Sequence, residues 1–174
     1  MKLIEIYENL FGYTVKWGVN SFFTDKDEKC FYYIKALILK QDEEPMIFVS
    51  ERGEYIIYSV IIPDENYRRI VALLELLREV YSAYEFILIE VKKHIINLVK
   101  DIVEGEKDIS ILDEYAKNKE KIKELLKRLY DLYRYAIIDT PELEKGIALV
   151  MALKLKEAQQ IVEDKLVKIT INAL

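Results

Sequence analysis

The longest stretch of the chain without a helix breaker places the strongest constraint on its fold. From Asn66 to Glu104 there is no glycine or proline, and apolar residues recur at heptad spacing. One row is Ile70, Leu77, Tyr84, Val91 and Leu98, and it is joined by Leu74, Tyr81, Leu88, Ile95 and Ile102. This period predicts one long buried helix, or two helices bent near Ser82 and Ala83. Residues 84–91 are also rich enough in β-forming residues to be a strand, and periodicity alone does not decide.

The residues before this stretch follow other periods. Residues 3–11 have apolar side chains at helical spacing and predict a short N-terminal helix that ends at Gly12. After it the apolar positions alternate or run together as they do in strands. The predicted strands are residues 13–19, 31–39, 46–50 and 55–62, and the second of them is apolar on both faces, as in a central strand. Arg52 and Gly53 indicate a tight hairpin between the last two strands.

The chain after Glu104 carries several signals of helix ends. Residues 105–108 predict a loop, and the pattern at 110–113 resembles a capping box that opens a second helix, which is expected to run to about Ile138. The Thr-Pro-Glu sequence at 140–142 is a strong start for a third helix. The tail at 165–171 alternates and predicts a last short strand.

Together these patterns predict an α+β protein. The expected order is a short N-terminal helix, a four-stranded antiparallel β-meander and a C-terminal bundle of about three long helices. A chain of 174 residues fits one domain. We therefore expect a single domain over residues 1–174, with a β-rich half at 1–63 and a helical half at 64–174.

Charge and composition argue against several classes of protein. The 31 acidic and 26 basic residues give a net charge of −5, so overall composition does not support binding to a nucleic-acid backbone. Cys30 is the only cysteine, which excludes an intramolecular disulfide and is typical of a reducing compartment. Charges interrupt residues 1–10, unlike a signal peptide, and the longest uncharged run, residues 55–63, is too short to cross a membrane. We expect a cytoplasmic protein; abundant Lys, Glu and Ile beside few Gln, Ser and Thr are typical of thermophiles.

His94 is the only histidine and marks the best candidate for a metal or acid–base site. On a helix, Glu90, His94 and Asp101 fall on one stripe, where they could hold a divalent metal or let Glu90 orient the imidazole. No second helix that supplies further ligands is identifiable, so a solvated helix face explains the stripe better. The glycines stand apart, which excludes phosphate-binding loops. A metal-dependent enzyme centred on His94 is the least favoured function, and we expect no cofactor.

A second helical stripe is basic. Its cations are Lys119, Lys123, Lys127 and Arg134. Tyr130 lies among them, and basic residues interleaved with aromatic ones can contact the backbone and bases of a nucleic acid. Glu120, Glu124 and Asp131 lie between these cations, however, and alternating charges are typical of an ordinary solvated helix. A nucleic-acid-associated accessory protein is therefore the alternative function.

The apolar surfaces favour protein–protein contact. The chain has 13 tyrosines, a residue type enriched at interfaces. A sheet that is apolar on both faces needs a cover on each, so helices on one face leave the other for a partner. The predicted interface residues are Tyr33, Leu37, Tyr81 and Tyr84. The sequence thus favours a non-enzymatic binding or assembly protein of unknown pathway that associates with itself, with another protein, or with both, and not with a membrane.

Overall fold

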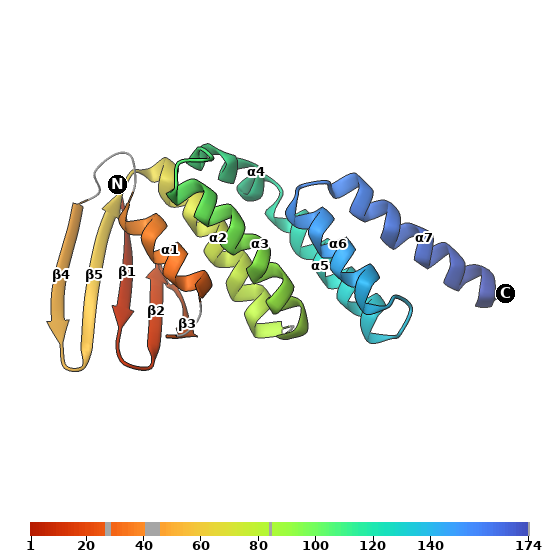
Figure 1. The fold of residues 1–174 in the computed structure, drawn as a ribbon, viewed down its shortest axis with the longest axis horizontal. Coiled ribbons are helices and arrows are strands. Elements are labelled where there is room, and N and C mark those ends of the chain that lie inside the picture. Colours follow the sequence, from red (N-terminus) through yellow and green to blue (C-terminus); the bar gives the residue numbers. More distant parts are fainter. Residues whose placement is uncertain (27–28, 41–45, 84, 174) are drawn as a thin grey trace.

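The computed structural model describes residues 1–26, 29–40, 46–83 and 85–173. It shows an α+β protein with a sheet at one end and helices over the rest of its length (Figure 1). Within these residues the strands are β1 (Lys2–Glu8), β2 (Gly12–Trp17), β3 (Asn20–Asp25), β4 (Met46–Arg52) and β5 (Tyr55–Ile62). The helices are α1 (Lys29–Leu39), α2 (Asp64–Ala83), α3 (Glu85–Val103), the short 3-10 turn η1 (Ile109–Ile111), α4 (Leu112–Lys117), α5 (Lys119–Arg134), α6 (Thr140–Met151) and α7 (Leu155–Ala173).

The described strands form one antiparallel sheet in the order β3-β2-β1-β5-β4. Ile4 pairs with Trp17 and Ile6 pairs with Val15, and all four side chains are buried on the same face of the sheet. We call this the inner face. The opposite, outer face carries Leu3, which is exposed.

The helices cover part of the inner face. The ring of Phe31 in α1 stacks on Tyr13 of β2 (ring centroids 5.7 Å apart) and meets Phe22 of β3 edge-on (5.1 Å). α3 packs against both α1 and α2, and α5, α6 and α7 extend the array of helices away from the sheet (Figure 1). The core therefore begins at the inner face under α1 and continues between the helices.

The predicted N-terminal helix at residues 3–11 is wrong, because most of this segment is β1. Its apolar residues also alternate: Ile4 and Ile6 face the core, whereas Leu3 and Tyr7 face outward. β1 pairs with β2 on one side and with β5 on the other, so both neighbours supply partners for its backbone groups. The spacing fitted both structures, and pairing with distant strands decided between them.

The predicted central strand at 31–39 is also wrong, because these residues form α1. Their buried side chains, Phe31, Ile34 and Leu37 among them, recur at helical spacing. A run that is apolar on nearly every side fits a helix packed between the sheet and α3 as well as it fits a central strand. Asn20–Asp25 supplies β3, which the sequence did not predict. The predicted four-stranded meander is therefore a five-stranded sheet.

Other predictions for the first half of the chain are confirmed. β2 occupies most of the strand predicted at 13–19, and the β4–β5 hairpin turns at Gly53 as expected. The prediction that this stretch forms two helices with a bend near Ser82 and Ala83 is confirmed, since α2 ends at Ala83 and α3 begins at Glu85. The alternative strand at 84–91 is wrong over residues 85–91, and Tyr84 lies outside the described residues.

The C-terminal part has more and shorter helices than the three that were predicted. The helix expected over 110–138 is divided into η1, α4 and α5. The helix start at 140–142 is confirmed, and its cap is Asp139, whose side chain accepts a hydrogen bond from a backbone N–H of the first turn (2.9 Å). A turn at Leu153 (φ 62°) separates α6 from α7. α7 continues through residues 165–171, so the predicted last strand is wrong.

Within the described residues, no helix is both long and apolar enough to cross a membrane. The sheet and the helices share one cluster of buried side chains that extends from Ile4 to Val162. That the chain forms a single domain over residues 1–174 stays a prediction.

Candidate functional site

β4 is an edge strand that is exposed along its whole length. In the part of the chain that the structure describes, it pairs only with β5, and all seven of its residues are exposed. Exposed fractions between 40% and 61% belong to four successive apolar side chains, Met46, Ile47, Phe48 and Val49. An edge strand also presents a row of unpaired N–H and C=O groups. β4 therefore combines free hydrogen-bonding groups of the backbone with an apolar surface.

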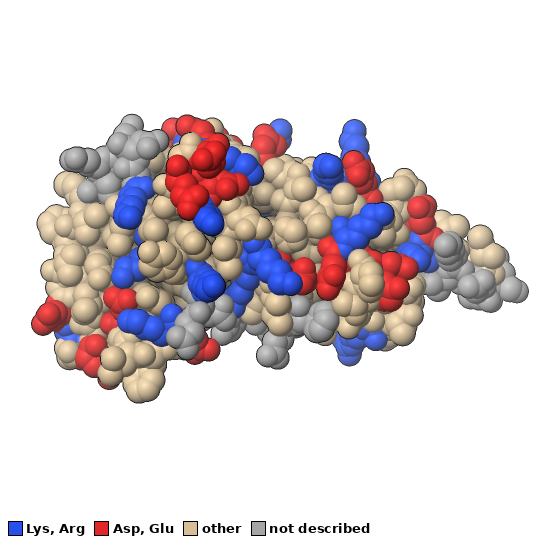
Figure 2. Space-filling model, in the orientation of Figure 1, with Lys and Arg blue, Asp and Glu red and all other residues tan. Residues whose placement is uncertain are grey.

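The apolar side chains of β4 point to both faces of the sheet, because successive residues of a strand alternate. By the register, Ile47 and Val49 lie on the inner face beside Val60 and Tyr58 of β5, whereas Phe48 lies on the outer face. The helices do not cover β4, since its inner-face residues are as exposed as its outer-face ones. Figure 2 shows the surface over β4 and β5, at the left of the molecule, as mostly uncharged.

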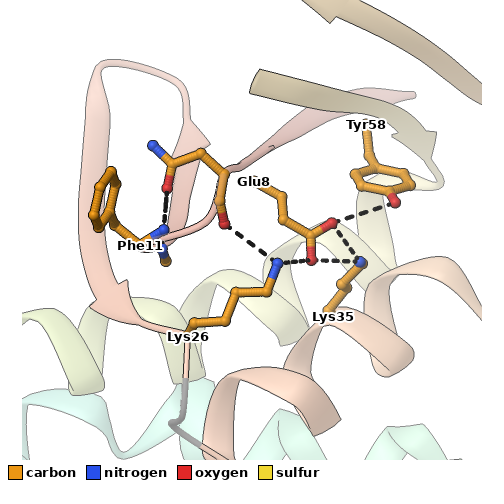
Figure 3. Close-up of polar contacts among 7 residues, drawn as sticks. Glu8, Phe11, Lys26, Lys35 and Tyr58 are labelled. Carbon is orange, nitrogen blue, oxygen red and sulfur yellow. Dashed lines mark hydrogen bonds and ion pairs between the residues drawn. The ribbon is translucent and has the colours of Figure 1, made fainter. Parts of the chain in front are cut away.

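A polar cluster marks the place where the helical cover ends. Glu8, the last residue of β1, accepts hydrogen bonds from Nζ of Lys26 (3.1 Å), from Nζ of Lys35 (3.2 Å) and from the hydroxyl of Tyr58 (3.5 Å) (Figure 3). Nζ of Lys35 also lies over the Tyr58 ring, 4.4 Å from its centroid, and 5.5 Å from the centroid of Tyr13. These contacts tie α1 to β1, β2 and β5, and none of these residues belongs to β4.

The charges of this cluster stabilise one another. Burial by itself raises the pKa of Glu8, but hydrogen bonds from Lys26 and Lys35 and the charge of Lys35 outweigh it, so the pKa lies below its ordinary value. Burial and the hydrogen bond to the negative Glu8 raise the pKa of Tyr13 to about 12. At pH 7 Glu8 is therefore ionised and Tyr13 is neutral. The ion pairs and hydrogen bonds of this state hold α1 on the sheet. A carboxylate with a lowered pKa does not serve as a base that takes up protons near neutrality.

The stripe of His94 lies on α3. Glu90 pairs with Lys93 (2.7 Å) and Asp101 pairs with Lys107 (3.4 Å). Burial lowers the pKa of His94; the charge of Glu90 opposes this shift and that of Lys93 adds to it. The imidazole is therefore neutral at pH 7. Among the described residues, no three His, Cys, Asp or Glu side chains are grouped so that they could hold a metal ion.

The basic stripe lies on α5, where part of it faces α2. Lys119 and Lys123 each form an ion pair with a glutamate of α2. The other two cations, Lys127 and Arg134, are exposed. Half of the predicted stripe therefore joins two helices of the same chain, and the positive surface open to a nucleic acid is smaller than the sequence indicated.

Two of the predicted interface residues, Tyr33 and Leu37, lie on α1 and not on β4. Leu37 of α1 is 2% exposed and belongs to the core, so a partner cannot reach it, and Tyr33 is half-buried against the same core. The side chain of Tyr81, and Tyr84 as a whole, lie outside the described part.

The sequence analysis predicted β4 as a strand but missed it as a surface. The available signal was the unbroken apolar run at 46–49 beside a hairpin turn, since a strand with one solvated face alternates.

Comparison with known proteins assigns no function to this chain. No protein-family model, curated protein sequence or solved structure matches it. The inference of function therefore starts from the chemistry of the β4 edge.

Proposed function

We propose that this protein is a non-enzymatic assembly protein that associates with itself through β4. The observation that carries the proposal is a seven-residue edge strand on which every residue is exposed and the first four are apolar. Natural proteins blunt such edges with charges, prolines, bulges or a covering element, because an open apolar edge pairs with other chains. Residues 46–49 contain no charge and no proline. A partner strand would satisfy the free backbone groups and place its own side chains beside these on both faces of the sheet.

The apolar surface of β4 is large enough to matter for association. Fully burying a Val, Ile, Phe or Met side chain contributes about 1.5–3 kcal/mol. About half of each of the four side chains is exposed. Covering them completely on two copies would contribute about 6–12 kcal/mol, which is an upper bound because strand pairing covers only part of each side chain. The loss of translational and rotational freedom opposes this by about 4–15 kcal/mol. The two contributions are of the same order. The affinity is therefore decided by the new hydrogen bonds between the backbones and by side-chain contacts on the outer face of the sheet.

The proposal is tested by the native mass of untagged protein, measured by size-exclusion chromatography with light scattering. We expect the wild type to exceed the 20.6 kDa of one chain and Phe48→Lys to shift toward that mass, because a lysine on an edge strand blocks pairing. Phe23→Lys is the matched control, since Phe23 is an exposed phenylalanine on the outer face of the opposite edge strand, and its mass should equal that of the wild type.

Two outcomes contradict self-association through β4. One is a wild type that stays monomeric at the highest attainable concentration, and the other is an unchanged mass for Phe48→Lys. Absorbance at two wavelengths during the same run detects copurifying nucleic acid. Its presence in the wild type, and its loss when Lys127 and Arg134 are both replaced by Gln, would favour the nucleic-acid alternative.

A further inference from the structure

We infer that the partner of β4 is the β4 strand of a second copy, paired antiparallel about Val49, so that two sheets join into one across a two-fold axis. This inference rests on the proposed self-association and adds its geometry. A two-fold axis that passes beside Val49 would place Val49 next to its own counterpart. Ile47 would then lie opposite Glu51 of the second copy, and Phe48 opposite Ser50.

The hairpin determines which backbone groups of β4 remain free. Gly53 and Glu54 form a two-residue turn, and a positive φ of 62° at Gly53 alone fits the type II′ hairpin. The pair that flanks such a turn, Arg52 and Tyr55, carries the hydrogen bond of the turn. Because bonded and non-bonded pairs alternate along an antiparallel ladder, Phe48 and Ser50 also bond to β5. The N–H and C=O groups of Ile47, Val49 and Glu51 therefore point away from β5.

Pairing about Val49 uses all of these free groups. Two antiparallel copies of Met46–Arg52 in this register overlap over their full length, and the outward groups of each copy face the outward groups of the other. A shift of two residues would leave two residues unpaired at each end. A shift of one would place outward-facing groups opposite residues that already bond to β5.

The charges of β4 favour the antiparallel direction. Both charged residues, Glu51 and Arg52, stand at the same end of the strand. A parallel pair would place Glu51 beside Glu51 and Arg52 beside Arg52, and like charges directly opposite each other destabilise a sheet. In the antiparallel pair, Glu51 lies beside Ile47 of the second copy, and the two charged ends are about 17 Å apart.

Pairing with a second copy would also limit the assembly to two chains. A two-fold interface uses the same surface on both partners and closes on itself. The only other edge of the described sheet is β3, which carries Ser21, Thr24 and Asp25 and lies under α1 through Phe22. We therefore expect dimers and not fibres.

The test is formation of a disulfide by a cysteine placed at the two-fold axis. In a hydrogen-bonded antiparallel pair the Cα atoms are about 5.5 Å apart, and disulfides span about 4.4–6.8 Å between Cα atoms. Val49→Cys should therefore form a disulfide-linked dimer on mild oxidation. Ile47→Cys is the matched control, because this position lies about 14 Å from its counterpart in the proposed register. We expect it to be linked at least about tenfold more slowly. Cys30 is buried, and the wild type controls for it.

The outcomes separate the geometry from the proposed function. A wild type that is dimeric by light scattering, while Ile47→Cys is linked as readily as Val49→Cys, overturns the register and leaves self-association standing. A monomeric wild type overturns both. Hydrogen exchange of the wild type supplies a measurement without a cysteine. We expect the amides of Ile47, Val49 and Glu51 to exchange at least about tenfold more slowly than in Phe48→Lys, and equal rates would overturn the pairing.

Discussion

Each of the two edge strands of this sheet, β3 and β4, pairs with one neighbouring strand, but helices cover β3 and leave β4 exposed. On β3, the inner-face ring of Phe22 packs edge-on against Trp17 (6.0 Å) and Phe31 (5.1 Å), and Thr24 is buried. On β4, every residue is exposed, and its inner-face Val49 is among the most exposed. The difference arises because α1 lies over β3, β2 and β1, while β4 lies beyond β5 (Figure 1).

This contrast shows that the sequence of an edge strand does not alone determine whether it is available to a partner. Both strands carry exposed phenylalanines on the outer face, Phe23 on β3 and Phe48 on β4. What distinguishes them is the inner face, where the helix layer ends along the line of Glu8 and Lys35. An assembly surface can therefore form where a covering layer stops short of the last strand.

The sharpest difference between the two edges should be seen in stability. Phe31→Ala removes the ring on which the inner face of β3 packs, and a buried Phe→Ala change lowers the free energy of unfolding by about 3–5 kcal/mol. Ile47→Ala on β4 should lower it by only about 1–2 kcal/mol, because 40% of that side chain is already in water. Both are measured by urea unfolding in the Phe48→Lys background, which removes the contribution of association. Equal losses would contradict the contrast.

The errors of the sequence analysis have a common physical cause. Residues 3–11 and 31–39 are short apolar runs, whose spacing fits a helix and a strand equally well. Each was decided by tertiary partners: β1 pairs with strands on both sides, and α1 is enclosed between the sheet and α3. Local chemical signals were confirmed at Gly53 and at residues 140–142. The capping box predicted at residues 110–113 was wrong, because Asp108 caps the 3-10 turn and α4 begins without a side-chain cap.

The candidate surface escaped prediction for the same reason. Leu37 was predicted to meet a partner because 31–39 was interpreted as a two-sided strand, and as part of a helix it belongs to the core. The unbroken apolar run at residues 46–49 indicates a strand that needs a cover on both faces, but that these faces are exposed is seen only in the structure. A single sequence does not encode directly which strand lies at the edge of its sheet.

A smaller effect on the free energy of unfolding should follow when one carbon is added near each of the two edge strands. A Cβ at Gly12 would lie 2.2 Å from the carbonyl oxygen of Thr24, so Gly12→Ala forces β3 to move. We expect it to lower the free energy of unfolding by about 1–3 kcal/mol. Ser50→Thr adds a carbon on exposed β4 and should change it by about 0.5 kcal/mol or less. If Gly12→Ala proved neutral in urea unfolding, the packing beside β3 would be as loose as that at β4.

The smallest expected effect concerns the boundary between the covered and the uncovered strands. The pKa of Glu8 is lower in the folded chain than in the unfolded one, so the unfolded chain binds the proton first as the pH falls. The carboxylate therefore stabilises the fold fully above about pH 5, and this contribution is lost as the pH falls through the lower pKa of the folded chain. It should amount to about 1 kcal/mol or less, as for other partly exposed ion pairs.

Glu8→Gln should flatten the pH dependence of the free energy of unfolding in this range, and Lys35→Met should flatten it in part, because Lys26 still binds the carboxylate. The double variant should behave as Glu8→Gln alone, since the lysine then has no carboxylate in this cluster to stabilise. If Lys35→Met retained the full pH dependence of the wild type, the attachment of α1 to β1 would not depend on this ion pair. Aromatic packing at Phe31 would then determine by itself where the cover ends and leaves β4 exposed.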